Sequence, residues 1–349
     1  MKQKESELRI PAEWEYHEAT WIGWPNNKQD WPGKFQPIPW VYGEIVRYIS
    51  RGEKVRIIVQ SEDHQKNAEK VLRSVQVDFN NIEFLKLKTD RNWLRDSGLQ
   101  FVKNEKGETK LIHFKFNAWA KYDNYKLDAK IPDMISRKTG LKKIKAEYNN
   151  QHVVLEGGSI DYNGFGSIIT TEECLLDNET QVRNPGFSKK DYEKVFEKYL
   201  GARQVIWLNK GIAGDDTHGH VDDIARFVNR NTIVTAIEQY PNDVNYIPLM
   251  ENREILEEAK LEDGSKPEIV DIPLPAPVIF KGERLPASYA NFYISNYAVL
   301  VPTFNDPNDK IALGILSELF DDRPVIGIHA VDLVWGLGTL HCLTHEQIL

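Results

Sequence analysis

The sequence is poor in cysteine, because its 349 residues contain only Cys174 and Cys342. These two cysteines form no C-x-x-C pair, so the sequence excludes a disulfide scaffold, a zinc ribbon and a thioredoxin-like motif. So few thiols are typical of a chain that works in a reducing compartment, and we expect a cytoplasmic protein.

Long apolar runs and a surplus of basic residues are also missing. No apolar stretch approaches the ~20 residues of a membrane span, and residues 1–18 lack the apolar segment of a secretory signal. The net charge of −8 argues against nucleic acid as a partner and is compatible with a small cation. We therefore expect no membrane and no nucleic-acid partner.

What is present is the composition of a globular chain, with 41% hydrophobic residues. Clusters of short strand-like runs such as "KVRIIVQ", "GSIITT" and "NTIVTAI" alternate with helical segments, and no low-complexity linker interrupts them. Asn163-Gly164 and residues 229–231 are predicted hairpin turns. Apolar residues recur at helical spacing in 40–50, 63–75, 188–201, 250–261 and 309–320. This pattern predicts an α/β fold built from a repeated supersecondary unit that closes on itself, in one domain over residues 1–349.

Four polar clusters follow strand-like runs, where α/β proteins often gather functional groups. Each combines glycine with aspartate, glutamate or histidine, and the last one also contains Cys342. The clusters are "TDRNWLRDSG" (89–98), "EGG" (156–158), "GDDTHGHVDD" (214–223) and "GLGTLHC" (336–342).

The residue types in these clusters favour one class of ligand. A cysteine thiolate is a strong nucleophile, and a histidine moves protons near neutral pH. Several carboxylates repel one another unless a cation joins them. A planar guanidinium group suits such a site, because carboxylates can grip it bidentately. Thiolate attack on its carbon, loss of ammonia and hydrolysis would yield a urea.

Several ordered motifs carry a resemblance to a known family. They include "IPAEWEYHEATWIGWP" (10–25), "NWLRDSG", "FNAWAKYDNY", "LEGGSID", "GDDTHGHVDD", "ERLPASYANFYI" and "WGLGTLHCLT". The sequence resembles the agmatine deiminase and bacterial peptidylarginine deiminase family of the guanidine-modifying (pentein) superfamily. The resemblance covers nearly the whole chain and implies a five-bladed α/β propeller with pseudo-fivefold symmetry.

The resemblance also implies roles for individual residues. Cys342 is expected to be the nucleophile, and His220 the general acid and base. Asp96 and Asp222 are expected to hold the guanidinium group, and Glu156 to hold the substrate and orient His220. No cofactor and no metal are expected, and the partners are a small cationic guanidine and, from relatives, further copies of the chain.

Other candidates carry weaker expectations. Trp93 is a candidate for lining the pocket and stacking on the substrate. Cys174 is interpreted as a core cysteine, and His218 as a supporting or surface group. The side chain of His341 is expected to point away from the pocket, because neighbours on a strand alternate.

The sequence departs from the family pattern at several positions. Leu99 ends a motif that usually ends in proline, "GLG" (336–338) replaces three glycines, "LTHEQIL" follows Cys342, and His329 stands where an aspartate is common. The glycine-loop change borders the site and leaves the far half of the substrate open.

The leading hypothesis is hydrolysis of agmatine to N-carbamoylputrescine and ammonia through a covalent thiouronium, a step of polyamine biosynthesis. Alternatives are a deiminase of peptidylarginine or free arginine, and an amidinotransferase with the same residues. A different class is a metal-dependent hydrolase that uses His218, His220 and the aspartates of "DDTHGHVDD". A non-catalytic binding module that uses the tryptophans explains the four clusters poorly.

Overall fold

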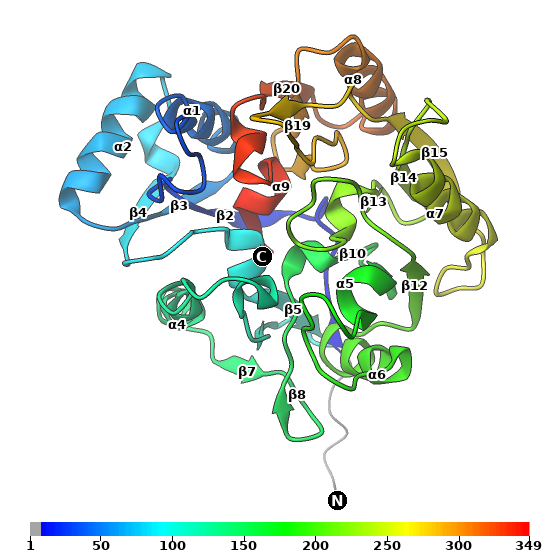
Figure 1. Ribbon diagram of the computed structural model, residues 1–349. Helices are drawn as coiled ribbons and strands as arrows, with labels where there is room; N and C mark the ends of the chain where they lie inside the picture. The colour runs from blue at the N-terminus through cyan, green and yellow to red at the C-terminus, as the bar shows by residue number, and fades with distance from the viewer. Residues whose placement is uncertain (1–7, 349) are drawn as a thin grey trace, which may run out of the picture.

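The computed structural model describes residues 8–348, in which helices lie around the outside of a group of small sheets (Figure 1). The five predicted helices are present, and α4 is a sixth helix of nine residues. The helices are α1 (Ile38–Ile49), α2 (Glu62–Ser74), α4 (Ile131–Thr139), α6 (Lys189–Leu200), α7 (Tyr246–Glu258) and α8 (Asn308–Leu319). The short helices are α3 (Leu94–Ser97), α5 (Glu172–Leu176) and α9 (Leu340–Leu343).

Helix α6 shows how local sequence sets these bounds. Ser188 and Asp191 form a capping box at its start, and Gly201 ends it in the left-handed conformation at φ = 74°. Helix α7 begins earlier than predicted and ends at Glu258, because Ala259 already has extended backbone. Helix α4 was not predicted from the sequence, although Gly140 ends it with φ = 71°.

Residues 8–348 form five mixed sheets of three or four strands and two small hairpins. In each of the five sheets an antiparallel pair is followed by a parallel strand that is reached through at least one helix. The predicted turns at Asn163-Gly164 and 229–231 join two of the antiparallel pairs. The fold is therefore α/β, with one supersecondary pattern used repeatedly along the chain.

The strands of these sheets have the following bounds. Two sheets have four strands. The first consists of β21 (Thr344–Ile348), β2 (His17–Gly23), β3 (Lys54–Val59) and β4 (Ile82–Lys86), and the second of β1 (Leu8–Arg9), β5 (Gln100–Asn104), β6 (Thr109–His113) and β7 (Lys143–Lys145). Three sheets have three strands. The first consists of β10 (Ile160–Tyr162), β11 (Ser167–Thr171) and β12 (Gln204–Leu208). The second consists of β13 (Ala225–Phe227), β14 (Thr232–Ile237) and β15 (Glu268–Pro273), and the third of β18 (Tyr293–Ile294), β19 (Val299–Thr303) and β20 (Val325–His329). The hairpins are β8 (Glu147–Tyr148) with β9 (Gln151–His152), and β16 (Ile279–Phe280) with β17 (Glu283–Arg284).

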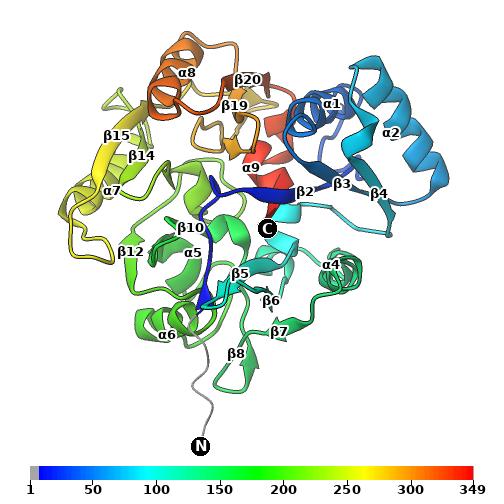
Figure 2. The ribbon, with the colours of Figure 1, turned by 180° about the vertical axis from the view of Figure 1, so that it is seen from behind.

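Strand β2 and the segment that leads into it cross the middle of the molecule, as the view from behind shows (Figure 2). There Glu13 accepts hydrogen bonds from Arg95 Nη2 at 3.0 Å, Arg226 Nη2 at 3.1 Å and the backbone amide of Ile294 at 2.8 Å. Arg226 continues the network to Asp161 on β10 at 2.7 Å. Because these charges are buried, each depends on its partners for solvation.

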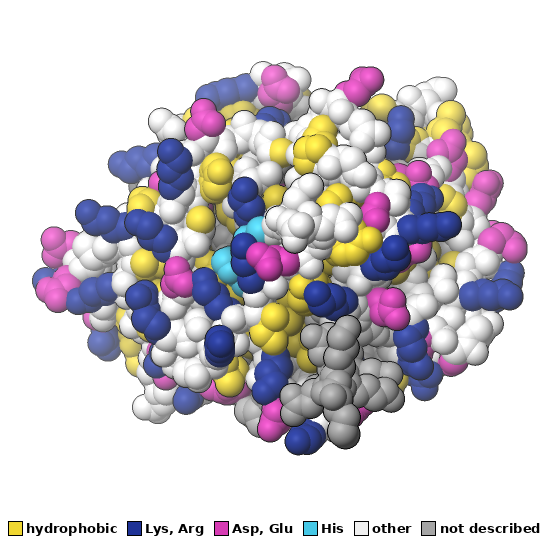
Figure 3. Space-filling view, turned by 90° about the horizontal axis from the view of Figure 1, so that it is seen from below, with side chains coloured by type: hydrophobic (Ala, Val, Ile, Leu, Met, Phe, Trp, Pro, Cys, Tyr) yellow, Lys and Arg dark blue, Asp and Glu magenta, His cyan; other side chains and the backbone are white. Residues whose placement is uncertain are grey.

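The outer surface has a different character. Seen from below in Figure 3, it mixes basic and acidic side chains, with hydrophobic ones scattered between them. Among residues 8–348, no helix combines the length and apolar character that crossing a bilayer requires.

Replacing Glu13 with glutamine should lower the free energy of unfolding by about 3–5 kcal/mol, because the buried charges of Arg95 and Arg226 would each lose one of their two carboxylate partners. Urea unfolding followed by circular dichroism measures the change. Glu62→Gln is the matched control, because its 2.6 Å pair with Lys86 is exposed and its loss should leave the stability unchanged. A Glu13→Gln protein as stable as the control would contradict this prediction.

Candidate active site

A cavity of about 340 Å³ opens beside the predicted nucleophile. Cys342, Asp96 and Trp93 line it, together with Trp119 and Tyr122. The cysteine near the end of the sequence is therefore in contact with a cavity large enough for a small molecule. Trp93 lies where the sequence hypothesis placed it, and its ring centroid is 5.7 Å from that of Trp31.

Cys342 lies in the short helix α9 and is almost fully buried. Its Sγ accepts a hydrogen bond from Asn291 Nδ2 at 3.1 Å and lies 3.7 Å from Asp222 Oδ2. Burial raises the pKa of this thiol well above its ordinary value, and nearby carboxylates, led by Asp222, raise it further. Cys342 in this site is therefore held as a thiol until the negative charge around it is neutralised.

His341 is not among the described residues that line the cavity, in agreement with the expectation that its side chain points away from the pocket. The reason given for that expectation does not hold, because residues 340–343 form a helix and strand alternation does not apply. The buried ring of His341 lies between two carboxylates, with Nδ1 at 2.7 Å from Asp222 Oδ2 and Nε2 at 2.8 Å from Glu13 Oε2. His341 thus joins the nucleophile's region to the buried charges of the molecular centre.

His220 stands at the start of a 3-10 turn, Val221–Asp223. Asp215 fixes the preceding loop by accepting hydrogen bonds from the backbone amides of Gly219 at 2.7 Å and His220 at 3.0 Å. Burial lowers the pKa of the His220 ring, but neighbouring acidic groups, led by Asp96, outweigh it and raise the pKa well above 6.5. The imidazole is therefore held in its charged form.

The distances around His220 leave it without a direct hydrogen bond among the described residues. Its Nδ1 lies 4.0 Å from both Asp96 Oδ1 and Asp222 Oδ1, and its Nε2 lies 3.9 Å from Glu156 Oε2. Both ring nitrogens are buried and have ion-pair partners but no hydrogen-bond partner within residues 8–348. Buried polar atoms without a hydrogen bond are rare, and an unfilled ligand site is one explanation for them.

Asp96 is carried by α3 and fixed by two donors. Gly158 donates its backbone N–H to Oδ1 at 3.0 Å, and Trp119 donates Nε1–H to Oδ2 at 2.8 Å. Burial raises the pKa of Asp96, and Asp222 and Glu156 raise it further. Trp119 lies in a left-handed turn in which Ala118, Trp119 and Ala120 all have φ between 53° and 59°. Such strain is often found where a side chain must be aimed.

Gly158 marks the point where the predicted site residues converge. A Cβ at this position would lie 2.6 Å from His220 Nδ1, 2.9 Å from Asp222 Oδ2 and 3.1 Å from Asp96 Oδ1. The absence of a side chain there lets one imidazole and two carboxylates approach the backbone of Gly158 closely. The structure therefore brings Asp96, Asp222 and His220 together at one point of the chain.

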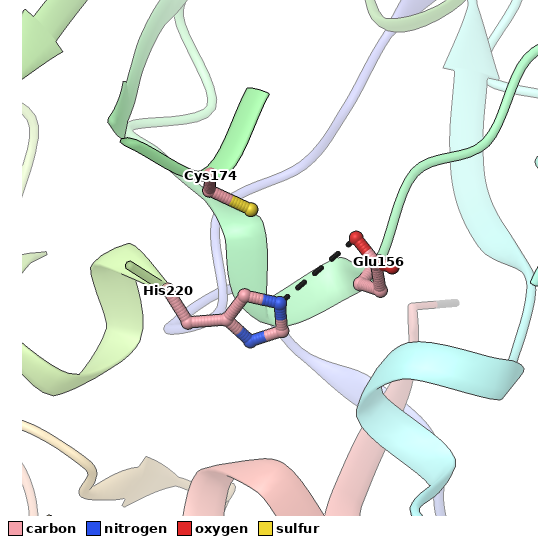
Figure 4. Close-up of side chains that lie close together, drawn as sticks. All are labelled: Glu156, Cys174 and His220. Carbon is pink, nitrogen blue, oxygen red and sulfur yellow. Dashed lines mark ion pairs between the residues drawn. The ribbon is translucent and has the colours of Figure 1, made fainter. Parts of the chain in front are cut away.

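Glu156 lies behind His220 and is held by Arg183, whose Nε donates to Oε1 at 3.2 Å. Burial raises the pKa of Glu156, but Arg183 and His220 lower it to about 2. Cys174, from α5, points to the same pair, as Figure 4 shows. It is buried in the core as predicted, but its position beside His220 was not foreseen.

The metal hypothesis based on "DDTHGHVDD" is not supported by the positions of its residues. Among residues 8–348, one group of histidine, cysteine and carboxylate ligand atoms lies within 4.8 Å of one another, and it consists of Glu156, Cys174 and His220. His218 instead bonds Asp177 Oδ2 at 2.7 Å, in line with its interpretation as a supporting residue.

Two departures from the family pattern have different positions. His329 is exposed at the end of β20. Leu337 lines the cavity and has φ = 67°, a left-handed conformation that suits glycine better. A Cβ on neighbouring Gly338 would lie 3.2 Å from Cys342 Sγ, so the "GLG" segment packs directly on the nucleophile.

The mouth of the cavity contains arginines that the sequence analysis did not anticipate. Arg91 Nη2 lies 3.1 Å from Asp30, and Arg284 Nη1 lies 2.8 Å from Asp243. Both arginines line the cavity, but each is already neutralised by a carboxylate. They therefore add little free positive charge to the cavity.

A family model described as Porphyromonas-type peptidyl-arginine deiminase matches residues 9–347. The chain belongs to this family. The match covers every site residue described above, from Glu13 to Cys342.

Individual relatives of the family agree over the full length. An agmatine deiminase of Pseudomonas aeruginosa is 32% identical over 97% of this chain and 95% of its own length. The solved agmatine deiminase of Enterococcus faecalis has a TM-score of 0.89 at 26% identity, covering 99% of this chain and 98% of its own. A C. jejuni agmatine deiminase with substrate bound has a TM-score of 0.87 at 29% identity, covering 100% of this chain and 98% of its own.

The raised pKa of Cys342 predicts how fast iodoacetamide alkylates the free protein at different pH values. The midpoint should lie clearly above the ~8.5 of an ordinary cysteine. Asp222→Asn should lower that midpoint, because it removes the leading nearby negative charge. Mass spectrometry of the peptide that contains Cys342 follows the reaction, and Cys342→Ser is the control. A midpoint near 8.5 that Asp222→Asn does not move would refute this electrostatic account.

Proposed function

We propose that this protein is a cysteine-dependent deiminase that hydrolyses agmatine to N-carbamoylputrescine and ammonia. The observation that carries the proposal is the convergence of Asp96, Asp222 and His220 at Gly158, next to Cys342, where Cys342 and Asp96 line the cavity. Family membership and full-length similarity to agmatine deiminases support the same reaction.

The carboxylates explain why the ligand is a planar cation. Asp222 Oδ1 is buried without a hydrogen-bond partner in the described part of the chain, so it can accept an N–H from a ligand. A guanidinium group offers several N–H donors in one plane and remains charged at any working pH. Its charge would offset the repulsion between Asp96 and Asp222 and lower the pKa of Cys342.

The reaction then follows from the protonation states of the site. The Cys342 thiol releases its proton to solvent when the cation binds, and Sγ forms a bond to the guanidinium carbon. Charged His220 donates a proton to one nitrogen, the C–N bond breaks and ammonia leaves, which gives an S-linked thiouronium; the ammonia takes up a proton from solvent. Neutral His220 then takes a proton from water as its oxygen bonds to that carbon. The C–S bond breaks, the remaining hydroxyl proton passes to the departing sulfur as the C=O bond forms, and Cys342 returns as a thiol with the ureido product.

The other end of the substrate is recognised by the charges at the mouth. Asp30 and Asp216 also line the cavity, and both are ion-paired, to Arg91 and Lys121 respectively. Glu283 of the β16–β17 hairpin is exposed at the cavity, and residues 8–348 supply it with no ion pair. A free carboxylate favours the terminal ammonium of agmatine over the carboxylate of arginine.

The architecture and partners belong to the same proposal. The five mixed sheets, each with one recurring strand order, support a five-bladed propeller of the pentein type in one domain over residues 1–349. A small cationic guanidine as the partner, and assembly of the chain into a homo-oligomer, follow from the family resemblance.

A substrate panel tests the proposed reaction. Purified protein is given agmatine, arginine or a blocked peptidylarginine, and the ureido product and ammonia are measured. We expect the highest kcat/KM for agmatine and at least about a thousandfold loss in Cys342→Ser, because the nucleophile is removed.

Each alternative gives a different result in the same panel. Consumption of no guanidine refutes the substrate class, and activity in Cys342→Ser refutes the nucleophile. A requirement for an added amine, with no net ammonia release in water alone, indicates an amidinotransferase. Loss of activity with a chelator, together with a harmless Cys342→Ser change, indicates a metal-dependent hydrolase.

Glu283→Gln should raise the KM for agmatine about fivefold, the effect of losing roughly 1 kcal/mol of partly exposed charge interaction. The KM for n-butylguanidine, which has no ammonium group, should stay the same. Steady-state kinetics of both substrates measure this difference, with Glu62→Gln as a control carboxylate away from the cavity. Equal changes in KM for both substrates would show that Glu283 does not bind the ammonium group.

A further inference from the structure

We propose that His341 is a positioning residue that carries a proton on each ring nitrogen and fixes which oxygen of Asp222 faces the substrate. The inference rests on the proposed function for its kinetic part only. Its geometric basis is the bridge from His341 Nδ1 to Asp222 Oδ2 at 2.7 Å and from Nε2 to Glu13 Oε2 at 2.8 Å.

The protonation state of His341 follows from its two partners. Burial raises the pKa of Glu13, but Arg226 and His341 outweigh it and lower this pKa well below its ordinary value. Glu13 also accepts hydrogen bonds from Arg95, Arg226 and the backbone amide of Ile294, so it is an acceptor toward His341 Nε2 as well. Burial raises the pKa of Asp222, and a hydrogen bond donated by His341 Nδ1 opposes this effect and lowers it. The geometry of the two contacts therefore assigns a proton to each ring nitrogen of His341.

The other charged groups around the bridge come from several elements and have both signs of charge. Two arginines face Glu13, and acidic and histidine side chains lie around Asp222 and His341. They are Arg95 of α3, Asp161 of β10, Arg226 of β13, His345 of β21, and His220 and Asp223 around the Val221–Asp223 turn. Since the arginines are shared with Asp161 and Glu346, the positive charge of His341 is not redundant for Asp222.

Because of this bridge, the two carboxylate oxygens of Asp222 have different roles. Oδ2 accepts the hydrogen bond from His341 and lies 3.7 Å from Cys342 Sγ. Oδ1 is buried and has no hydrogen-bond partner among residues 8–348, and it lies 4.0 Å from His220 Nδ1. A carboxylate rotates readily about its terminal bond, because that torsion has a broad energy well. His341 removes this freedom and leaves Oδ1 available to a guanidinium N–H.

Two substitutions separate the two arms of the bridge. The amide of His341→Asn reaches only as far as ring Nδ1, so it keeps a donor for Asp222 and loses the one for Glu13. The amide of His341→Gln reaches as far as ring Nε2, so it keeps the donor for Glu13 and loses the one for Asp222. Both variants lose the positive charge, which makes each a matched control for the other.

We expect His341→Gln to lower kcat/KM for agmatine at least tenfold more than His341→Asn, mainly through KM. The acid limb of the pH profile should also move to higher pH by about one unit in His341→Gln. The sign follows because His341 lowers the pKa of Asp222, so without it the carboxylate protonates at a higher pH and cation binding is lost there. Thermal melting of both variants shows how much of any loss is a loss of fold.

Nitrogen-15 NMR of histidine-labelled protein tests the protonation state without substrate. The ring signals that disappear in His341→Asn belong to His341, and they should show protons on both nitrogens at pH 8. A neutral His341 ring overturns the inference, as do equal kinetic losses in the two variants with an unmoved acid limb. If the wild-type protein consumes no guanidine, the proposed function fails, and the NMR result alone then decides whether the bridge exists as described.

Discussion

The site depends on the ionic contact that Glu13 makes with Arg95, Arg226 and His341 at the centre of the molecule. Glu13 precedes β2, whereas its partners come from α3, β13 and α9, so one carboxylate joins segments from the whole length of the chain. Removing a member would leave other buried charges unsatisfied. The positions of the nucleophile and of the acidic groups around it therefore follow from how this centre is assembled.

Carboxylates shift the pKa values of both the nucleophile and the proposed acid in the free site. Carboxylates lie around both Cys342 and His220, and they affect the reactivity of the two groups in opposite ways. They raise the pKa of the thiol, which keeps it unreactive, and they raise the pKa of the imidazole, which keeps it ready to donate a proton. A bound cation changes the first condition directly, because it offsets the charge that holds the proton on sulfur. The nucleophile therefore stays protonated and unreactive until a cationic ligand binds.

The sequence predicted the parts of this molecule that local pattern controls. Helix α6 has its capping box and its terminal glycine, and the polar clusters around Asp96 and His220 converge as expected. Trp119 was missed although its motif was recognised, because its contact with Asp96 requires three successive left-handed residues that no propensity predicts. The contacts of Glu13 and of His341 were missed because their partners lie more than a hundred positions away or depend on a helix of only four residues.

The pairing of β2 with β21 has a consequence for the order of folding. Trp21 and Gln347, which bond across these strands, are 326 positions apart. Closing so long a loop carries a large entropic cost, so contacts of this kind tend to form late. Helix α9 leads directly into β21, and the nucleophile is therefore anchored by one of the most distant contacts in the chain. A chain that has not yet paired β2 with β21 would lack this anchor for Cys342, so the reactive site depends on a contact between the two ends of the described chain.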